Sequence, residues 1–322
     1  MKKTTKLQEL FHRTEIFTLA GGGCALHARI AEEAGYEAAY MSGATTAATI
    51  LGIPDAGLIT MTEMVENAGR MANVISIPLV SDSDQGFGNA INVRRTVQSF
   101  IRAGVSGIHI EDQPFPKRCG FVKGKEVISL EEAVGKYRAA VDAKNELDPD
   151  FVIIARCDAR GASGGSLEET IERLRAYKAV GVDVVYPEAL TSREEVRAVR
   201  EAVDGPMMGT LGFLDPPPSL EELQQLGFAA AFYPGLIAQA GVRASWEYAH
   251  DFRARGVQAQ IEWAAQAPRY PMPHMFDLVG FPQVAEWEQR YLPAEWLAKY
   301  EDSIGGYDPR ASERPAAMTA PR

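Results

Sequence analysis

The chain has 322 residues, of which 46% are hydrophobic and 24% are charged, and its formal net charge is −10. This composition excludes a wholly disordered protein, and the length suits one α/β barrel with additional terminal segments. The acidic balance argues against general nucleic-acid binding, because such binding needs a basic face that displaces counterions.

The amino-terminal sequence MKKTTKLQEL has basic residues with no apolar stretch behind them, and no later run approaches the ~20 apolar residues of a membrane span. We therefore expect a cytoplasmic protein without a membrane segment. The three cysteines, Cys24, Cys119 and Cys157, form no CxxC pair, which disfavours both a disulfide framework and a zinc cluster. Reduced thiols are the expected state, with Cys24 and Cys157 as small core residues.

Short apolar runs rich in β-formers recur along the chain, each followed by an amphipathic stretch. The eight predicted strands are residues 16–20, 38–41, 78–81, 107–110, 151–155, 182–186, 206–208 and 229–232. The clearest helices follow the third, fourth and fifth strands, at residues 92–103, 129–147 and 166–180. Eight such units predict an α/β fold of the (β/α)8 TIM-barrel type, with an open doubly wound sheet as the alternative.

Three consecutive glycines after the first strand, Gly21, Gly22 and Gly23, are a candidate dinucleotide-binding loop. The third glycine of that fingerprint falls on Leu26, whose side chain would obstruct close packing of the helix on the strand. The dinucleotide interpretation is therefore disfavoured.

Beyond the eighth strand the pattern is helical, over residues 236–255 and 284–299, with the proline-rich PRYPMPHMFDLVGFP between them. We expect residues 1–245 to form the barrel and residues 246–310 to form a helical extension. Residues 311–322 are small, polar and proline-bearing, so we expect a disordered tail.

Acidic residues stand where four neighbouring predicted strands end. In a parallel barrel these carboxyl ends form one rim, and catalytic groups gather there. Carboxylates so placed repel each other unless a hard cation neutralises them, which predicts magnesium, or alternatively manganese. The competing interpretation is that these acids cap helices or form surface ion pairs. The strand-end acids are Asp82, Asp84, Glu111, Asp112, Asp158 and Glu188, and Arg156 stands two residues before Asp158.

Between Glu111 and Glu126 lies QPFPKRCGFVKGK, which carries four basic residues around Cys119. We expect a mobile loop whose charge suits an anionic substrate. Because Lys117 and Arg118 precede Cys119, its thiol should ionise more easily than a core cysteine and exchange a proton, unless it is an incidental surface thiol. His109 lies within an apolar strand, so packing is its expected role.

Five strings, YMSGATTAATILGIPDAGLITMTE, SDSDQGFGNAINVRRTV, GIHIEDQPFPKRCG, IIARCDAR and VVYPEA, resemble the isocitrate lyase and phosphoenolpyruvate mutase superfamily in their order and spacing. The resemblance runs through roughly residues 7–187 with few gaps. It implies a barrel whose last helix is exchanged between subunits, usually within a homotetramer. It also implies magnesium-dependent chemistry on a small 2-hydroxy or 2-oxo carboxylic acid.

The resemblance assigns roles to individual residues. The metal would be positioned by Asp82, Asp84 and Glu111. The substrate would be bound by Ser42, Gly43, Ala44, Asp55, Gly120, Arg156 and Arg243. Catalysis would involve Cys119, Arg156, Glu188 and Tyr40.

Cys119, within KRCG, matches the cysteine that lyase members use as a general acid. This points to carbon–carbon cleavage of the 2-methylisocitrate lyase or 2,3-dimethylmalate lyase kind, with Arg156 binding the substrate oxyanion and Glu188 supporting it. Tyr40 is a candidate base only because it adjoins the substrate loop.

The sequence departs from the lyase pattern at three places that would contact the far half of the substrate. Phe121 stands where the lyases have histidine, the segment Gly209–Phe213 replaces a polar stretch, and Gln239 replaces an arginine, although Arg243 lies close in sequence. An uncharged or bulky leaving group is therefore expected instead of succinate.

Two alternatives remain open at this point. The same fold supports oxaloacetate decarboxylation or hydrolysis and phosphonomutase chemistry, and some members of these groups dispense with the cysteine. A protein that binds oxo acids without turning them over is the alternative from another class.

Overall fold

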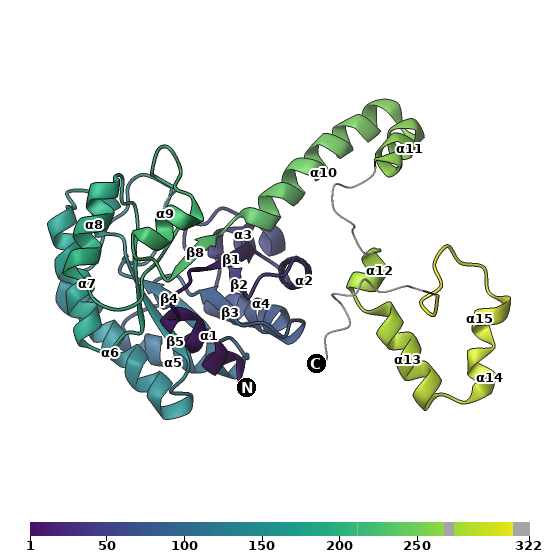
Figure 1. The fold of residues 1–322 in the computed structure, drawn as a ribbon, viewed down its shortest axis with the longest axis horizontal. Coiled ribbons are helices and arrows are strands. Elements are labelled where there is room, and N and C mark those ends of the chain that lie inside the picture. The colour runs from purple at the N-terminus through teal and green to yellow at the C-terminus, as the bar shows by residue number, and fades with distance from the viewer. Residues whose placement is uncertain (211, 267–273, 312–322) are drawn as a thin grey trace. The chain divides into compact units, whose positions relative to one another are not determined.

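The computed structural model describes residues 1–210, 212–266 and 274–311, and its fold is drawn in Figure 1. Residue contacts divide the chain into two compact units, one from Met1 to Gln239 and the other from Ala240 onward. All but the first residue of the tail expected to be disordered lies outside the described residues, as does part of the proline-rich segment.

Eight parallel strands form the centre of the first unit. They are β1 Phe17–Gly22, β2 Ala38–Met41, β3 Leu79–Asp82, β4 Gly107–Glu111, β5 Val152–Cys157, β6 Val184–Pro187, β7 Met208–Gly209 and β8 Ala230–Tyr233. Neighbours follow the order β6-β5-β4-β3-β2-β1-β8-β7. A parallel bridge between Val185 and Met207 joins the two ends of this series. The sheet therefore closes on itself, so the TIM-type barrel is confirmed and the open doubly wound alternative is wrong.

Helices follow the strands and surround them (Figure 1). Polar residues begin most of them: the side chains of Thr60, Asn89, Ser129, Ser166, Ser192 and Ser219 each accept a hydrogen bond from a backbone N–H of the first turn. The predicted strands and the three clearest predicted helices lie within two residues of the observed ones. The helices are α1 Lys3–His12, α2 Ala25–Glu33, α3 Gly43–Thr46, α4 Met61–Asn73, α5 Ala90–Arg102, α6 Leu130–Leu147, α7 Leu167–Ala179, α8 Arg193–Ala202 and α9 Leu220–Gln225.

The barrel interior and the layer between strands and helices are separate hydrophobic clusters. The interior cluster contains alternate strand residues such as Leu19, Val80 and Ile154, together with Leu7 and Phe11 of α1. Because side chains alternate across a strand, the intervening residues face the helices. Helix α1 thus supplies apolar side chains to the barrel interior, and the polar residues of the interior gather toward the carboxyl ends of the strands.

The second unit is helical. Its helices are α10 Leu236–Arg255, which begins in the first unit, α11 Val257–Ala265, α12 Met275–Leu278, α13 Phe281–Tyr291, α14 Ala294–Leu297 and α15 Lys299–Asp302. The expectation of one helix over residues 284–299 is wrong: α13 ends at Tyr291, because Pro293 cannot donate to the helical ladder and forces a new start. Among the described helices, none combines the length and apolar character needed to cross a bilayer.

Candidate active site

The strand ends β2 to β6 bring the predicted metal and catalytic side chains to one end of the barrel. Asp82 and Glu111 are the last residues of β3 and β4, Arg156 lies on β5, and Glu188 directly follows β6. All four side chains are buried. Buried charges persist only when they are paired or bound to an ion, so the pairing of each one indicates what the site can hold.

Asp82 binds the start of the loop that follows β2. Its Oδ2 accepts a hydrogen bond of 3.0 Å from the backbone N–H of Gly43, and its Oδ1 accepts one of 2.9 Å from Asp84 N. A Cβ on residue 43 would lie 2.8 Å from Asp82 Oδ2, so this close approach requires glycine. Burial alone would raise the pKa of Asp82, but His109, Lys117 and Arg156 lower it to about 2.

Asp84 adopts a left-handed backbone conformation with φ of 48°, which is uncommon for a residue with a side chain and often occurs at functional sites. Burial raises the pKa of Asp84 to about 6, and the neighbouring Asp82 and Asp55 carboxylates act in the same direction against Lys117. A cation beside it would favour the ionised form.

Glu111 is completely buried, and neither of its carboxylate oxygens has a hydrogen-bond partner. The guanidinium Nη1 of Arg156 lies 3.4 Å from Oε2, and burial raises the pKa of Glu111 well above its ordinary value. Within the described part of the chain, no group of three or more His, Cys, Asp or Glu side chains is arranged to hold a metal ion. Magnesium needs few protein ligands and keeps water, so the unpaired oxygens of Glu111 with Asp82 and Asp84 fit this ion.

Arg156 is held in a fixed orientation. Its Nε and Nη2 donate to the two carboxylate oxygens of Asp158 at 2.8 and 2.9 Å, and its guanidinium lies over the ring of Tyr186. Lys125 Nζ also lies 3.4 Å from Asp158 Oδ1, so Asp158 pairs with two cations. The sequence placed Asp158 at the rim without a role, although its spacing of two from Arg156 along an extended chain was the available signal. This two-point pairing leaves Nη1 of Arg156 directed toward Glu111.

Glu188 lies on the other side of this arginine. Its Oε2 accepts a hydrogen bond from the hydroxyl of Tyr186, and burial raises the pKa of Glu188 above its ordinary value. A Cβ on Gly120 would lie 2.6 Å from both Arg156 Nη2 and Glu188 Oε1. The backbone of the Cys119 segment therefore lies directly against this pair.

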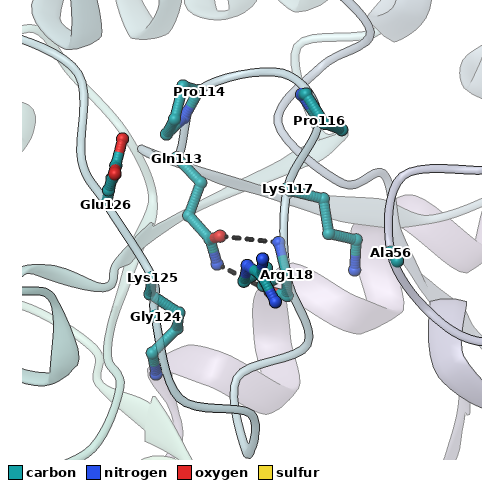
Figure 2. Close-up of a pocket in the computed structure, with 9 residues that line it drawn as sticks. All are labelled: Ala56, Gln113, Pro114, Pro116, Lys117, Arg118, Gly124, Lys125 and Glu126. Carbon is teal, nitrogen blue, oxygen red and sulfur yellow. Dashed lines mark hydrogen bonds between the residues drawn. The ribbon is translucent and has the colours of Figure 1, made fainter.

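Lys117, in the basic segment before Cys119, pairs with acidic residues at the carboxyl ends of the strands. Lys117 is 2% exposed, and its Nζ lies 2.6 Å from Asp55 Oδ1 and 2.9 Å from Asp84 Oδ1. The side chain of Gln113 donates to Arg118 O and accepts from Arg118 N, closing the turn shown in Figure 2. A pocket of about 300 Å³ lies beneath this turn, and Figure 2 shows Lys117 extending along it toward Ala56.

Two of the four basic residues of this segment, Lys117 and Lys125, therefore have partners within the protein. Lys125 Nζ donates a hydrogen bond of 2.6 Å to Gly120 O. The expectation that the charge of this segment suits an anionic substrate stays a prediction. Neither role was visible in the sequence, because it depends on contacts with distant residues such as Asp55.

The prediction for the ionisation of Cys119 is wrong. Burial raises the pKa of this thiol, and the Asp55 carboxylate adds to the effect more than Lys117 offsets it. Lys117 points its charge at Asp55 and Asp84 instead of at the sulfur. The thiol accordingly stays protonated at neutral pH, which suits a proton donor.

His109 and Tyr40 form a buried pair in the barrel interior. Tyr40 Oη and His109 Nε2 share a hydrogen bond of 2.6 Å, and His109 Nε2 lies 3.7 Å from Asp82 Oδ1. Burial lowers the pKa of His109 to about 4 and raises that of Tyr40 well above its ordinary value. His109 packs in the core as expected, and it also links Tyr40 to the acidic cluster.

The remaining predicted substrate residues fall in two places. Ser42 caps the short helix α3, and Gly43 and Ala44 begin it, so their backbone N–H groups lie at the rim beside Asp82. Arg243 belongs to the second unit, where it pairs with Glu247 on the same helix at 2.9 Å. Its assignment to the substrate stays a prediction.

Residues 7–253 match the family model described as phosphoenolpyruvate phosphomutase. The chain is 42% identical to the 2-methylisocitrate lyase of Escherichia coli strain K12 over 238 residues, covering 73% of this chain and 79% of the relative. It is 39% identical to the 2,3-dimethylmalate lyase of Eubacterium barkeri over 236 residues, covering 73% and 80% of the two chains.

Solved structures agree with these matches. An oxaloacetate acetylhydrolase in complex with 3,3-difluorooxalacetate superposes with a TM-score of 0.82 at 35% identity, covering 90% of this chain and 97% of that one. A phosphonopyruvate hydrolase in complex with oxalate and magnesium superposes with a TM-score of 0.81 at 29% identity, covering 91% and 100%.

Proposed function

Because the chain belongs to the isocitrate lyase and phosphoenolpyruvate mutase superfamily of enzymes, we propose that it is a magnesium-dependent carbon–carbon lyase. Its substrate is a small 2-hydroxy carboxylic acid, of the 2-alkylmalate or methylisocitrate kind, and its products are a 2-oxo acid and a second carboxylic acid. The observation that carries the proposal is the position of Cys119 on a turn whose next residue, Gly120, lies directly against Arg156 and Glu188.

Asp82, Asp84 and Glu111 would hold magnesium, with manganese as a possible substitute. When bound, the ion supplies positive charge for the oxygens of the substrate and lowers the cost of charge developing there. The two unpartnered oxygens of Glu111 support this assignment.

The residues of the chain account for the other requirements of the reaction. Ser42, Gly43 and Ala44 would receive the substrate carboxylate at the start of α3, and Arg156 would stabilise negative charge on the 2-oxygen. The 2-hydroxyl loses its proton, the bond between C2 and C3 breaks, and its electron pair passes to C3. Cys119 then protonates C3.

Tyr40 remains the proposed base: its hydroxyl would accept the substrate proton as it passes its own to Nε2 of His109, which is neutral because burial lowers its pKa to about 4. Glu188 is proposed to support Arg156. Asp55 is proposed to contribute by pairing with the charge of Lys117. Gly120 is proposed to contribute because its backbone can approach Arg156 closely. Arg243 is proposed as a further substrate-binding residue. A cytoplasmic location and a homotetramer with an exchanged helix complete the proposal.

The test replaces the proton donor. Cys119→Ser should lower kcat/KM for oxo-acid release from 2-alkylmalates or methylisocitrate by about a hundredfold or more, the usual contribution of a general acid. The matched control is Cys24→Ser, which alters a cysteine outside the proposed machinery and should retain turnover. Magnesium removal by chelation should abolish release in both proteins.

Two outcomes would contradict the lyase. Oxo-acid release that is unchanged by Cys119→Ser, above all from oxaloacetate, would favour a hydrolase or decarboxylase, a possibility supported by the similarity to oxaloacetate acetylhydrolase. Metal-dependent oxalate binding without turnover of any acid would favour a binding protein.

A further inference from the structure

The segment that follows β3, residues 83–88, carries Asp84 and leads into helix α5 in an uncommon backbone conformation. We call residues 83–88 the metal loop. Its positive φ values are 48° at Asp84, 84° at Gly86, 58° at Phe87 and 145° at Gly88. Such values are costly for residues with a side chain and persist only where the surroundings determine them. Contacts from outside the metal loop must therefore hold it in this shape.

Three consecutive carbonyls of the metal loop each meet a donor from a different element. Glu111 N of β4 donates to Asp84 O at 3.0 Å, which joins the backbones of two proposed magnesium residues. Lys136 Nζ of α6 donates to Gln85 O at 3.2 Å. Thr96 Oγ1 of α5 lies 3.0 Å from Gly86 O. The position of Asp84 relative to Glu111 thus depends on side chains of two surrounding helices.

Lys136 is 3% exposed, and it is buried for the sake of this contact. Among the residues that the structure describes, Gln85 O is the acceptor that its Nζ has, and no carboxylate forms an ion pair with it. Lys144, one and a half turns further along α6 and 5% exposed, pairs instead with Asp183 at 2.6 Å. A buried amine is costly unless its hydrogen bond is needed, so Lys136 serves the metal loop.

Thr96 is completely buried and supports the next carbonyl of the loop. Its hydroxyl lies 3.0 Å from Gly86 O and 3.1 Å from Asn92 O of its own helix, so its proton is shared between the metal loop and α5. Loss of this hydroxyl would leave the Gly86 carbonyl without that donor, at a cost that a small movement of the loop would relieve.

We propose that Lys136 and Thr96 are positioning residues for magnesium, which hold the metal loop so that Asp84 keeps the orientation that the ion requires. The inference rests on the proposed function for its metal, and neither side chain is a ligand. Magnesium demands near-ideal octahedral geometry, whereas calcium accepts irregular sets of oxygen ligands. A loosened loop should therefore weaken the binding of magnesium more than that of calcium.

The experiment titrates Mg²⁺ and Ca²⁺ separately into the full chain, freed of metal by chelation, and measures Kd by calorimetry. Lys136→Met keeps the length of the side chain and removes the donor. We expect its Kd for Mg²⁺ to rise about tenfold or more, as when an outer-shell partner of a metal site is lost. Its Kd for Ca²⁺ should stay within about threefold. Loss of a repelling ammonium charge alone would do the opposite and tighten the binding of both ions.

Thr96→Val has nearly the same shape and keeps the charge of the site, so it tests the loop without an electrostatic change. We expect its Kd for Mg²⁺ to rise about fivefold, and this variant decides the question if Lys136→Met does not fold. The matched control is Lys144→Met, which removes a buried lysine of the same helix that pairs away from the metal loop. It should leave Kd for both ions within about threefold.

The outcomes separate the inference from the function. Magnesium binding that is unchanged or tighter in Lys136→Met and Thr96→Val overturns the positioning role and leaves the lyase in place. Equal losses for Mg²⁺ and Ca²⁺ also overturn it, because they indicate general damage to the fold. Selective loss of magnesium affinity in a chain that turns over no acid supports the positioning role and overturns the lyase. A wild-type chain that binds no magnesium overturns both.

Discussion

At the scale of single residues, the protonation of Cys119 is the property with the clearest consequence for pH dependence. Burial and Asp55 raise the pKa of the thiol, so the proton-donating form is fully present below that pKa and is lost as pH rises through it. We expect the alkaline limb of kcat/KM to lie above the ordinary thiol pKa of about 8.5. A limb at or below that value would contradict the assignment.

Asp55→Asn removes one of the two influences that raise the pKa of the Cys119 thiol. It should therefore move the alkaline limb of kcat/KM to lower pH. The thiolate can be followed by its ultraviolet absorbance, taking the difference between each protein and its Cys119→Ser counterpart so that Cys24 and Cys157 cancel. An unchanged or higher pKa in Asp55→Asn would show that the Asp55 charge does not reach the sulfur.

Asp158 is the main partner of a buried arginine. Asp158→Asn leaves Arg156 without its two-point charge pair, which should lower the free energy of unfolding by about 3 kcal/mol, as expected when one member of a buried ion pair is removed. Urea denaturation measures this change. Asp142→Asn, at an exposed site on α6, should stay within about 0.5 kcal/mol of wild type. Equal effects in the two variants would refute the role of Asp158.

At the scale of elements, helix α6 holds two strands together at the level of the site. The hydroxyl of Tyr137 donates to Ile110 O at 2.9 Å and Arg156 O at 3.0 Å, on β4 and β5. Asp112, just beyond β4, accepts hydrogen bonds from Asp158 N and from Tyr177 of α7. The rim acids therefore divide into a group that faces the site and a group that fixes strands to helices.

Tyr137→Phe tests this division. Because two buried carbonyls lose their shared donor, unfolding free energy should fall by about 1–2 kcal/mol. The barrel should still form, since the ring retains its packing. Tyr36→Phe, which alters a partly buried tyrosine before β2, is the comparison in the same denaturation series. If Tyr137→Phe is as stable as wild type, the hydroxyl does not join the two strands.

At the scale of the whole molecule, the first unit contains every residue proposed for the site except Arg243. The second unit carries many exposed apolar side chains, including Trp246, Trp263 and Trp287. We predict a homotetramer that depends on this unit. A chain ending at Gly256 should keep the barrel's circular dichroism but sediment as a smaller species than the full chain. A full chain that sediments as a monomer would contradict the prediction.

The sequence by itself determined the eight strands and the helices after three of them, all within two residues of the observed bounds, and the collection of acids at one rim. These features follow from local rules: burial periodicity marks strands and helices, and parallel strands must end at the same edge of a barrel. The family could also be recognised from the sequence, because the order and spacing of motifs are properties of the chain.

Only the tertiary structure decided the pairing of charges and the direction in which Cys119 titrates. Lys117 looked like a neighbour that would ionise the thiol, yet it bonds to Asp55 and Asp84, and burial dominates. Asp158 acquired its role by reaching Arg156, and Phe121 stacks on Phe213 of a different loop. Such effects depend on burial and on contacts between residues far apart in the chain, which no local pattern encodes.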